Sequence, residues 1–380
     1  MKKILIWADS PTAPTGFGNV VKNILNYFPT EEYEVVVYGI NHNGRKSDLG
    51  YKIYGVDSKT DSYGYKGFKS VLKKVKPDIL FLINDIWVIQ EMLSQVKQDI
   101  TTVVYFPVDA EDHDPRWYVC LDRVSKAVVY NEFGWRVANK ARSSINYQII
   151  EHGVDGNVFY KEFADRTEAK KALFTAPELH DSFIILNAGR NQPRKRLDIT
   201  LRGFAEFSKD KPDVFLYMHS GIKDSHIDTL RLANELGILP KLIMTTDQEG
   251  IPNLDPSDLN LLYNACDVGI NTGLGEGFGL PNAEHAATGA VQIVPAHSAL
   301  VDLYEDCGIL IPAEILFTLD NISTTARMVT VQDVANALEL VYRDKDLYNK
   351  HSKLCHEKFT SEKYSWDYIT QQWVDLFKEL

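Results

Sequence analysis

Apolar and polar positions follow two different rhythms along the first 150 residues. Short, nearly continuous apolar runs predict buried β-strands, at residues 4–8, 33–38, 79–83, 102–106, 127–130 and 147–150. Between these runs, apolar residues recur at helical spacing, as in 18–27, which predicts helices with one buried face. Apolar strands that alternate with helices are typical of a parallel sheet covered on both faces.

The same pattern begins again after a segment without strand character. Residues 151–182 are rich in glycine, proline and charge, and we place the domain junction there. Further strands are predicted at residues 183–188, 214–218, 242–245, 267–271, 292–294 and 308–311. Thr330, with Asp333 three residues later, is typical of a helix N-cap. The chain is therefore predicted to be an α/β protein with two Rossmann-like, doubly wound domains, 1–160 and 161–364, whose strands end at a common ligand cleft.

Length and composition are those of an ordinary globular protein. The chain has 380 residues, of which 44% are apolar and 24% charged, enough for two separate cores. The apolar part of MKKILIWADS is too short for a signal peptide, and no run approaches the ~20 apolar residues of a membrane span. The four cysteines form no CxxC pair. We therefore expect a cytoplasmic protein with free thiols.

Charge is divided unevenly between the two halves. The net charge is −11, but residues 1–150 carry 19 Lys and Arg against 17 Asp and Glu, or +2, while the remainder carries 22 against 35, or −13. The first half is therefore the better candidate surface for an anionic partner.

The segment EGFGLPNAE carries two carboxylates, Glu276 and Glu284, around a glycine-rich turn that follows a predicted strand. The helix expected after this turn would present unpaired N–H groups and a positive dipole end, both of which favour phosphate. Gly277 and Gly279 allow the backbone to approach a ligand closely. Carboxylates suit hydroxyl groups, so a nucleotide-sugar fits this segment.

A second candidate is NAGRNQPRKRLD, which lies between a predicted strand and a predicted helix. Arginine and lysine here could neutralise a leaving diphosphate without a metal. We select Arg190 and Lys195 for this role and expect Arg194 and Arg196 to be surface residues. An exposed basic helix start is the alternative interpretation.

The opening loop, DSPTAPTGFGN, places Gly16 and Gly18 between the first strand and the first helix. Its backbone could contact a diphosphate, although most such turns carry a glycine for structural reasons. GxGxxG, Walker and HExxH motifs are lacking, and the DxD pairs follow no predicted strand. We expect neither a dinucleotide cofactor nor a metal.

Taken together, GRNQPRK, YNACDVGIN, EGFGLPNAE and GILIP resemble the motifs of retaining glycosyltransferases of the GT-B fold, in particular family 4. The resemblance is strong over residues 183–312 and weaker over 1–160, where TGFG and HGVD carry it. It implies a UDP- or GDP-sugar donor, transfer with retention, and a C-terminal helix, 365–380, that crosses back to the first domain. It also implies that Glu284 holds the ribose. Glu276 and the backbone of the turn would face the donor sugar and β-phosphate, the turn residues being Gly277, Phe278, Gly279 and Leu280.

Three positions depart from the family pattern. Asp109 stands where a histidine is usual, His285 where an alanine is usual, and Gly273 where a serine is usual. Asp109 could stabilise positive charge on the donor sugar or orient an acceptor hydroxyl. Asn84 and Asp85 are candidates for the acceptor side, with turn capping as the alternative.

The acceptor is left open by the sequence. Residues 41–76 are rich in lysine and tyrosine, and a solvated face is the first interpretation. An anionic membrane surface and DNA with hydroxymethylated bases, the substrate of some short viral and phage transferases, are the others. A nucleotide-sugar-binding protein without activity is a further alternative. We expect no stable protein partner.

Overall fold

The computed structural model describes residues 1–45, 50–96, 100–250, 252–320 and 322–380. The chain divides into two compact units. The first unit consists of Met1–Gly153 and Lys363–Leu380, and the second of Val154–Glu362. The predicted boundaries, after 160 and 364, lie slightly later in the sequence.

The first unit is built on a seven-stranded sheet with the order β3-β2-β1-β4-β5-β6-β7. All neighbouring strands are parallel. The strands are β1 (Lys2–Asp9), β2 (Tyr33–Ile40), β3 (Lys52–Gly55), β4 (Ile79–Ile83), β5 (Thr101–Phe106), β6 (Lys126–Val129) and β7 (Tyr147–Ile149). The central strands are buried on both faces, which explains their continuous apolar sequences.

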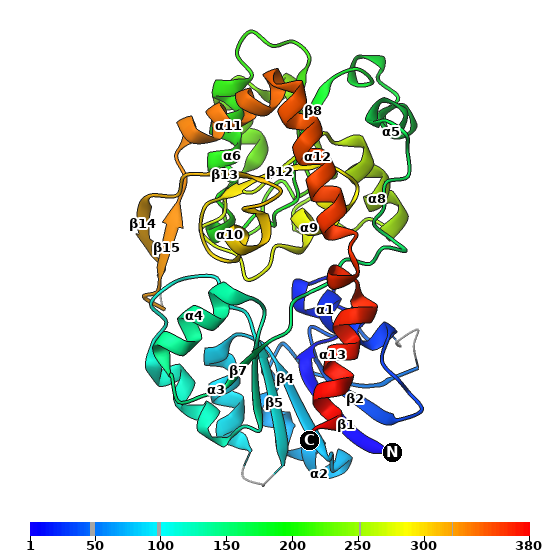
Figure 1. Cartoon of the computed structure of the whole chain (residues 1–380), viewed down its shortest axis with the longest axis vertical. Coiled ribbons are helices and arrows are strands. Elements are labelled where there is room, and N and C mark those ends of the chain that lie inside the picture. Colours follow the sequence, from blue (N-terminus) through cyan, green and yellow to red (C-terminus); the bar gives the residue numbers. More distant parts are fainter. Residues whose placement is uncertain (46–49, 97–99, 251, 321) are drawn as a thin grey trace. The chain divides into compact units, whose positions relative to one another are not determined.

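Helices cover both faces of this sheet. One core contains residues of α2 (Tyr65–Val75), α3 (Ile86–Gln95), α4 (Glu132–Ala141) and the 3₁₀ segment η1 (Pro115–Arg123). On the other face lie α1 (Gly16–Asn26) and α13 (Trp366–Lys378), the red helix in front of the sheet in Figure 1. The ring of Trp373 lies 4.7 Å from those of Phe81 and Tyr105. The C-terminal helix therefore completes the core of the first unit.

The second unit contains a six-stranded parallel sheet with the order β10-β9-β8-β11-β12-β13 and an antiparallel pair, β14 and β15. The sheet strands are β8 (Phe183–Asn187), β9 (Val214–Met218), β10 (Leu242–Met244), β11 (Val268–Ile270), β12 (Val291–Pro295) and β13 (Ile309–Ile311). The pair is Ile315–Thr318 with Thr325–Met328.

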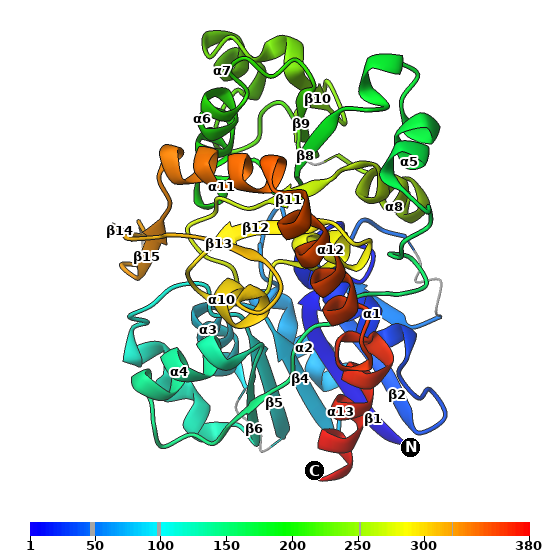
Figure 2. The same cartoon turned by 45° about the horizontal axis from the view of Figure 1, so that its top comes forward.

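One face of the second sheet packs against α6 (Leu197–Phe207), α7 (Thr229–Glu235) and α11 (Val331–Arg343). Figure 2 shows α6 and α11 side by side on this face. The remaining helices of this unit are α5 (Arg166–Leu173), α8 (Pro256–Ala265), α9 (Leu280–Ala287), α10 (Ala299–Tyr304) and α12 (Lys345–Phe359). None of the helices in the described ranges is long and apolar enough to cross a membrane.

The predicted strands are all present, with ends that differ by a residue or two. Thr330 caps α11 as predicted, because its hydroxyl accepts from the Asp333 N–H at 3.1 Å. The prediction missed β3, β14 and β15, since these strands are short and largely lack buried side chains. The helix predicted from residue 18 begins at Gly16.

Candidate functional site

The turn between β11 and α9 is the centre of the candidate site in the second unit. Gly279 is the N-cap of α9 with φ of +84°, a left-handed conformation that favours glycine. No side chain caps the helix at this end. The turn therefore presents the positive end of α9 at the carboxyl edge of the sheet.

Glu276 lies buried in this turn between two cations. Its carboxylate forms an ion pair with the Lys195 ammonium, and Arg194 Nη1 lies 3.5 Å from Glu276 Oε2. Burial alone would raise the pKa of Glu276, but Lys195 and Arg194 outweigh it and lower the pKa to about 2. Glu276 is therefore a carboxylate throughout the neutral pH range.

A chain of buried amides holds Glu276 from the other side. Asn271 Nδ2 donates to Glu276 Oε1 at 3.2 Å and to Asn282 Oδ1 at 3.1 Å, and Asn282 Nδ2 donates to Gln292 Oε1 at 2.9 Å. Backbone groups fix the direction of the chain. The Gly273 N–H donates to Asn271 Oδ1, and the carbonyl of Ala290 accepts from Gln292. Each amide therefore has a defined orientation, and an N–H group faces Glu276.

Glu284 lies on α9 and differs from Glu276 in its surroundings. The Tyr263 hydroxyl donates to Glu284 Oε2 at 3.2 Å. Burial raises the pKa of Glu284 to about 7, although the Tyr263 hydrogen bond opposes this rise. The two glutamates of the motif are therefore one firmly ionised group and one that titrates near neutral pH.

The two selected cations of NAGRNQPRKRLD pair with different carboxylates. Arg190 Nε lies 2.6 Å from Asp224 Oδ2, whereas Lys195 pairs with Glu276. The expectation that Arg194 and Arg196 are surface residues is wrong for Arg196, whose side chain is 19% exposed, whereas the Arg194 side chain is 40% exposed. Arg194 faces Glu276, and Arg196 pairs with Asp198 at 2.7 Å. Arg194 belongs to the site, and its role was missed because the sequence does not show which side of a 3₁₀ turn each cation occupies.

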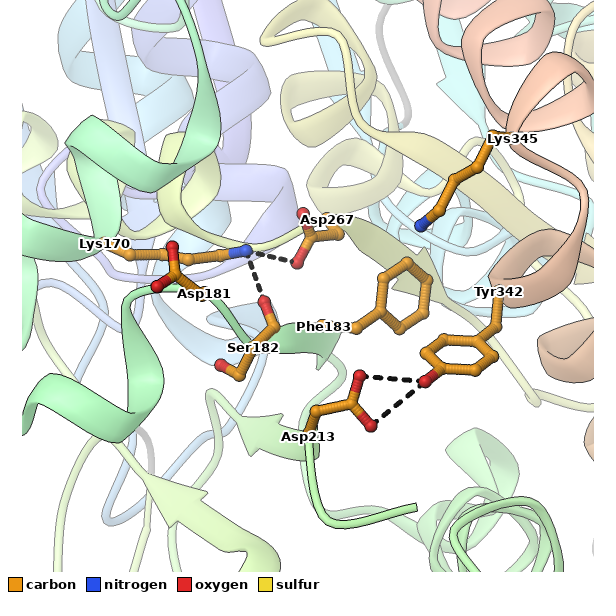
Figure 3. Close-up of a pocket in the computed structure, with 8 residues that line it drawn as sticks. All are labelled: Lys170, Asp181, Ser182, Phe183, Asp213, Asp267, Tyr342 and Lys345. Carbon is orange, nitrogen blue, oxygen red and sulfur yellow. Dashed lines mark hydrogen bonds and ion pairs between the residues drawn. The ribbon is translucent and has the colours of Figure 1, made fainter.

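A pocket of about 460 Å³ elsewhere in the second unit does not belong to this site (Figure 3). Phe183, Asp213 and Asp267 lie at the amino ends of β8, β9 and β11, the opposite edge from Glu276. Part of its lining is paired, and the Lys345 ammonium lies 5.8 Å from the ring centroids of Phe183 and Tyr342. Lys170 pairs with Asp267 at 2.8 Å, and the Tyr342 hydroxyl donates to Asp213. The pocket therefore lies at the amino edge of the sheet, away from the carboxyl edge where ligands of such sheets bind.

In the first unit, Gly16 and Gly18 lie in the first turn of α1 and not at the apex of the preceding loop. The Gly18 N–H already donates to the Thr15 hydroxyl at 3.0 Å. A Cβ at Gly18 would lie 2.4 Å from the Ala13 carbonyl oxygen, whereas nothing lies within 4 Å of one at Gly16. Gly18 thus has a structural reason to be glycine, and Gly16 is the position with open space.

Asp109 and the two acceptor-side candidates, Asn84 and Asp85, lie at the carboxyl edge of the first sheet. Asn84 follows β4 and accepts from the Asp85 N–H at 2.9 Å, and Asp85 is the N-cap residue of α3. Asp109 follows β5 and lies near His113. Burial lowers the pKa of His113 to about 4, although the negative charge of Asp109 opposes this shift. The sheet order places these loops next to each other. Asn84 therefore makes a turn contact, whereas the Asp85 side chain does not cap α3, and both residues lie on the edge where a ligand would bind.

Aromatic residues around these candidates were not identified from the sequence. The rings of Trp87 and Trp117 lie 5.2 Å apart, and that of His113 lies 5.4 Å from Trp117. His113 Nε2 is buried without a hydrogen-bond partner. Trp87 lies four residues after the predicted strand 79–83, a signal that could have located it, whereas Trp117 lies eleven residues after the predicted strand 102–106.

In the lysine- and tyrosine-rich region 41–76, the described lysines are exposed, whereas most of the tyrosines make contacts within the fold. Lys46 lies outside the described residues. Lys66, Lys69 and Lys73 lie exposed on α2, and Lys76 follows the helix with φ of +49°. The tyrosine ring of Tyr54 lies beneath two lysine ammonium groups, at 5.2 and 5.0 Å.

Other aromatic residues of this region are used within the fold. The Tyr51 hydroxyl donates to the Leu25 carbonyl at 3.0 Å, and Phe68 is fully buried. Tyr63, which is 39% exposed, is the main ring presented to solvent in the described part of 51–76. The region therefore offers charge without a row of open stacking surfaces.

Two of the three departures from the family pattern have packing explanations. The His285 ring stacks on Tyr263 with centroids 5.3 Å apart, and its Nε2 lies 3.1 Å from the Cys266 carbonyl oxygen. Burial lowers the pKa of His285 to about 3, so the ring is neutral. A Cβ at Gly273 would lie 3.0 Å from Asn271 Oδ1, within the amide chain. Asp109, the third departure, lies at the carboxyl edge of the first sheet.

The acidic and histidine side chains of the described residues contain no group of three positioned to hold a metal ion. Asp112 and Asp114, one of the DxD pairs, form ion pairs with Lys140 and Arg116.

No protein-family model matches the sequence. A curated protein, D-inositol 3-phosphate glycosyltransferase from Nocardioides sp., is 25% identical over 241 residues, which are 61% of this chain and 48% of that protein. The chain therefore spans about half the length of this curated relative.

Solved structures match over the whole chain. Sucrose-phosphate synthase from Thermosynechococcus elongatus superposes with a TM-score of 0.79 at 16% identity, covering 100% of this chain and 99% of its own. The chain has the GT-B fold. Anabaena HepE, solved in complex with UDP and glucose, gives a TM-score of 0.71 at 14% identity and covers 100% of both chains. The predicted fold and the resemblance to this class of glycosyltransferases are confirmed.

Proposed function

We propose that this protein is a glycosyltransferase that moves a sugar from a nucleoside diphosphate sugar to a hydroxyl acceptor. The observation that carries the proposal is the position of Glu276, paired with Lys195 and Arg194 beside the uncapped start of α9. Cations and a helix N-terminus bind a diphosphate, and a firmly ionised carboxylate binds sugar hydroxyls. The name of the curated relative supports the same activity.

In this proposal the second unit neutralises the leaving diphosphate. The bond between the anomeric carbon and the diphosphate oxygen breaks, and the acceptor oxygen forms the new bond. Arg190, Lys195 and the Gly279 end of α9 would stabilise the charge that develops. A phosphate oxygen would take the acceptor proton, with retention and without a metal.

Each glutamate would have a separate task. Glu276, with the backbone of Gly277, Phe278 and Leu280, would contact the donor sugar and the β-phosphate, and Glu284 would accept hydrogen bonds from the ribose. Glu276 is a poor nucleophile because two cations share its charge and its pKa is about 2. We therefore assign it to positioning the sugar and not to a covalent intermediate.

The acceptor side belongs to the first unit in this proposal. Asp109 would orient the acceptor hydroxyl, with Asn84 and Asp85 on the neighbouring loop. Gly16 would approach the donor through its open backbone.

The test is slow hydrolysis of a panel of nucleotide-sugars, measured as released nucleoside diphosphate. We expect release from one class of donor, at a rate that is unchanged by EDTA and lost in Lys195→Ala. Binding without release would support the alternative of an inactive nucleotide-sugar-binding protein, and neither binding nor release would contradict the proposal.

A further inference from the structure

A second pocket of the second unit, with a volume of about 420 Å³, lies at the carboxyl ends of β9 and β10. It thus shares an edge of the sheet with the candidate donor site. Its walls are three apolar side chains and a short polar run, and its lining residues are Ile222, Leu230, Met244, Thr245, Thr246 and Asp247.

The loop that follows β9 connects this pocket to the diphosphate-binding cations. Ile222, in the pocket wall, accepts a hydrogen bond from Asn191 Nδ2 at 3.2 Å through its backbone carbonyl. Asp224, two residues later, holds Arg190. The pocket wall and Arg190 are therefore positioned by the same loop, so a ligand that spans both would have its diphosphate at Arg190 and its other end in the pocket.

The lining of the pocket suits a flat heteroaromatic ring with hydrogen-bond donors on its edge. Ile222, Leu230 and Met244 provide apolar contact for the ring faces. Thr245 is oriented by His219, whose Nδ1 lies 2.8 Å from the Thr245 hydroxyl oxygen, and burial lowers the pKa of His219 to about 4. Asp247 is the one ionisable side chain among the lining residues.

A carboxylate at this position distinguishes between the common bases. An ionised Asp accepts hydrogen bonds and cannot donate them. Guanine presents two adjacent N–H donors, N1–H and the N2 amine, that one carboxylate can accept together. Uracil presents a single N3–H between two carbonyl oxygens, which the carboxylate would repel. Adenine and cytosine place a ring acceptor beside their amine, which leaves one carboxylate oxygen against a lone pair.

We propose that this pocket binds the base of the donor and that Asp247 selects guanine, so that the donor is a GDP-sugar. The inference rests on the proposed function. Gln248 Nε2 donates to Asp247 Oδ1 at 3.1 Å. This contact leaves the carboxylate further acceptor positions, since its two oxygens together offer about four lone pairs.

The test is calorimetric titration of the full chain with GDP, UDP, ADP and CDP, which needs no acceptor and no turnover. We expect GDP to bind at least about tenfold more tightly than the other three, the discrimination typical of one bidentate base contact. Asp247→Asn should remove most of this preference by weakening GDP alone. Glu249→Gln changes an exposed carboxylate of the same loop that does not line the pocket and should leave the preference intact.

The outcomes separate this inference from the proposed function. Equal or tighter binding of UDP, or a GDP preference that survives Asp247→Asn, would overturn guanine selection by Asp247 and leave the glycosyltransferase proposal standing. Failure of all four nucleotides to bind would overturn both.

Discussion

The carboxyl edges of the two sheets carry opposite chemistry on similar scaffolds. In the second unit, Arg190 and Lys195 follow β8 and face carboxylates that already fix their positions. In the first unit, the loops after β4 and β5 carry Asp85 and Asp109, with half-buried tryptophans around them. The parallel α/β fold supplies the edge in both cases, and the side chains of the loops decide what binds there.

This difference indicates which of the two edges has its charged groups in position before a ligand binds. An edge with paired cations is prepared for a diphosphate, because its charges need little rearrangement when the ligand arrives. An acidic edge with aromatic rings disfavours anions and suits a neutral hydroxylated acceptor. The variants below test this contrast, from the largest expected effect to the smallest.

Deletion of residues 365–380 should separate the two units most clearly. It removes α13, whose Trp373 and Phe377 are fully buried against the first sheet. Loss of one such aromatic side chain typically costs about 3–5 kcal/mol. Hydrogen exchange read by peptide should increase throughout Met1–Gly153 and change little in Val154–Glu362. Equal loss of protection in both units would contradict the division.

Lys195→Ala should reduce turnover by about 10²–10³-fold, the range seen when one donor to a developing oxyanion is removed. It should also destabilise the second unit, because buried Glu276 loses its main partner. Lys211→Ala is the matched control. Lys211 is similarly exposed, at 17% against 16%, and pairs with Glu339 at 2.9 Å away from the turn. Activity of Lys195→Ala close to that of Lys211→Ala would remove Lys195 from the mechanism.

Glu284→Gln should weaken donor binding while it stabilises the fold. The folded-state pKa of about 7 lies above the ordinary 4.5, so the folded protein binds more protons between these values and loses stability as pH rises through them. At pH 8 the ionised, buried Glu284 lowers the free energy of unfolding of the wild type by up to about 3 kcal/mol, at about 1.4 kcal/mol per pKa unit. At pH 4 Glu284 is protonated, and this destabilisation is absent.

Thermal unfolding should therefore show Glu284→Gln above the wild type at pH 8 and level with it at pH 4. Donor affinity of the wild type should fall between pH 8 and pH 6 as Glu284 takes up a proton, and this fall should be absent in the variant. Glu305→Gln changes an exposed glutamate of the same unit and should alter neither curve. If the variant were less stable than the wild type at pH 8, the ionised Glu284 carboxylate would not destabilise the folded protein.

The smallest effect is expected from reversing the charge of Lys69 and Lys73 on α2. Both are exposed, and the acidic carboxyl edge gives no reason for them to hold the acceptor. Transfer should change less than twofold, an effect of about 0.4 kcal/mol. The nucleic-acid alternative would instead be supported if the wild type bound duplex DNA with an affinity that falls steeply with salt, and the variant lost this binding. Anionic vesicles provide the same comparison for a membrane surface.

The sequence predicted the strands well because their signals are local. Buried parallel strands need continuous apolar runs, and the runs from Ile79 and Phe183 show this directly. Strand β3 was missed because its half-exposed residues, Lys52–Gly55, lie in a region of dense charge.

The site was predictable only in part, because pairing is not local. The motif identified Glu276 and Glu284, but nothing in it distinguishes their protonation, which depends on Lys195 and Arg194 in one case and on burial in the other. The amide chain is similarly not apparent in the sequence, since Asn271 follows β11 and Gln292 lies in β12. Contacts that join distant segments required coordinates.

The way the chain enters and leaves the second unit also bears on how the protein is made. The two crossing points lie side by side, since a Cβ at Gly153 would lie 2.8 Å from the backbone nitrogen of Trp366. The first unit is therefore interrupted by an inserted second unit and receives its last helix from the end of the chain. During synthesis, the second unit has all its residues before the first does. Of the two units, the one whose strands are made first is thus the last to be completed, and until then part of its sheet face lacks the cover of α13 and could be recognised by chaperones.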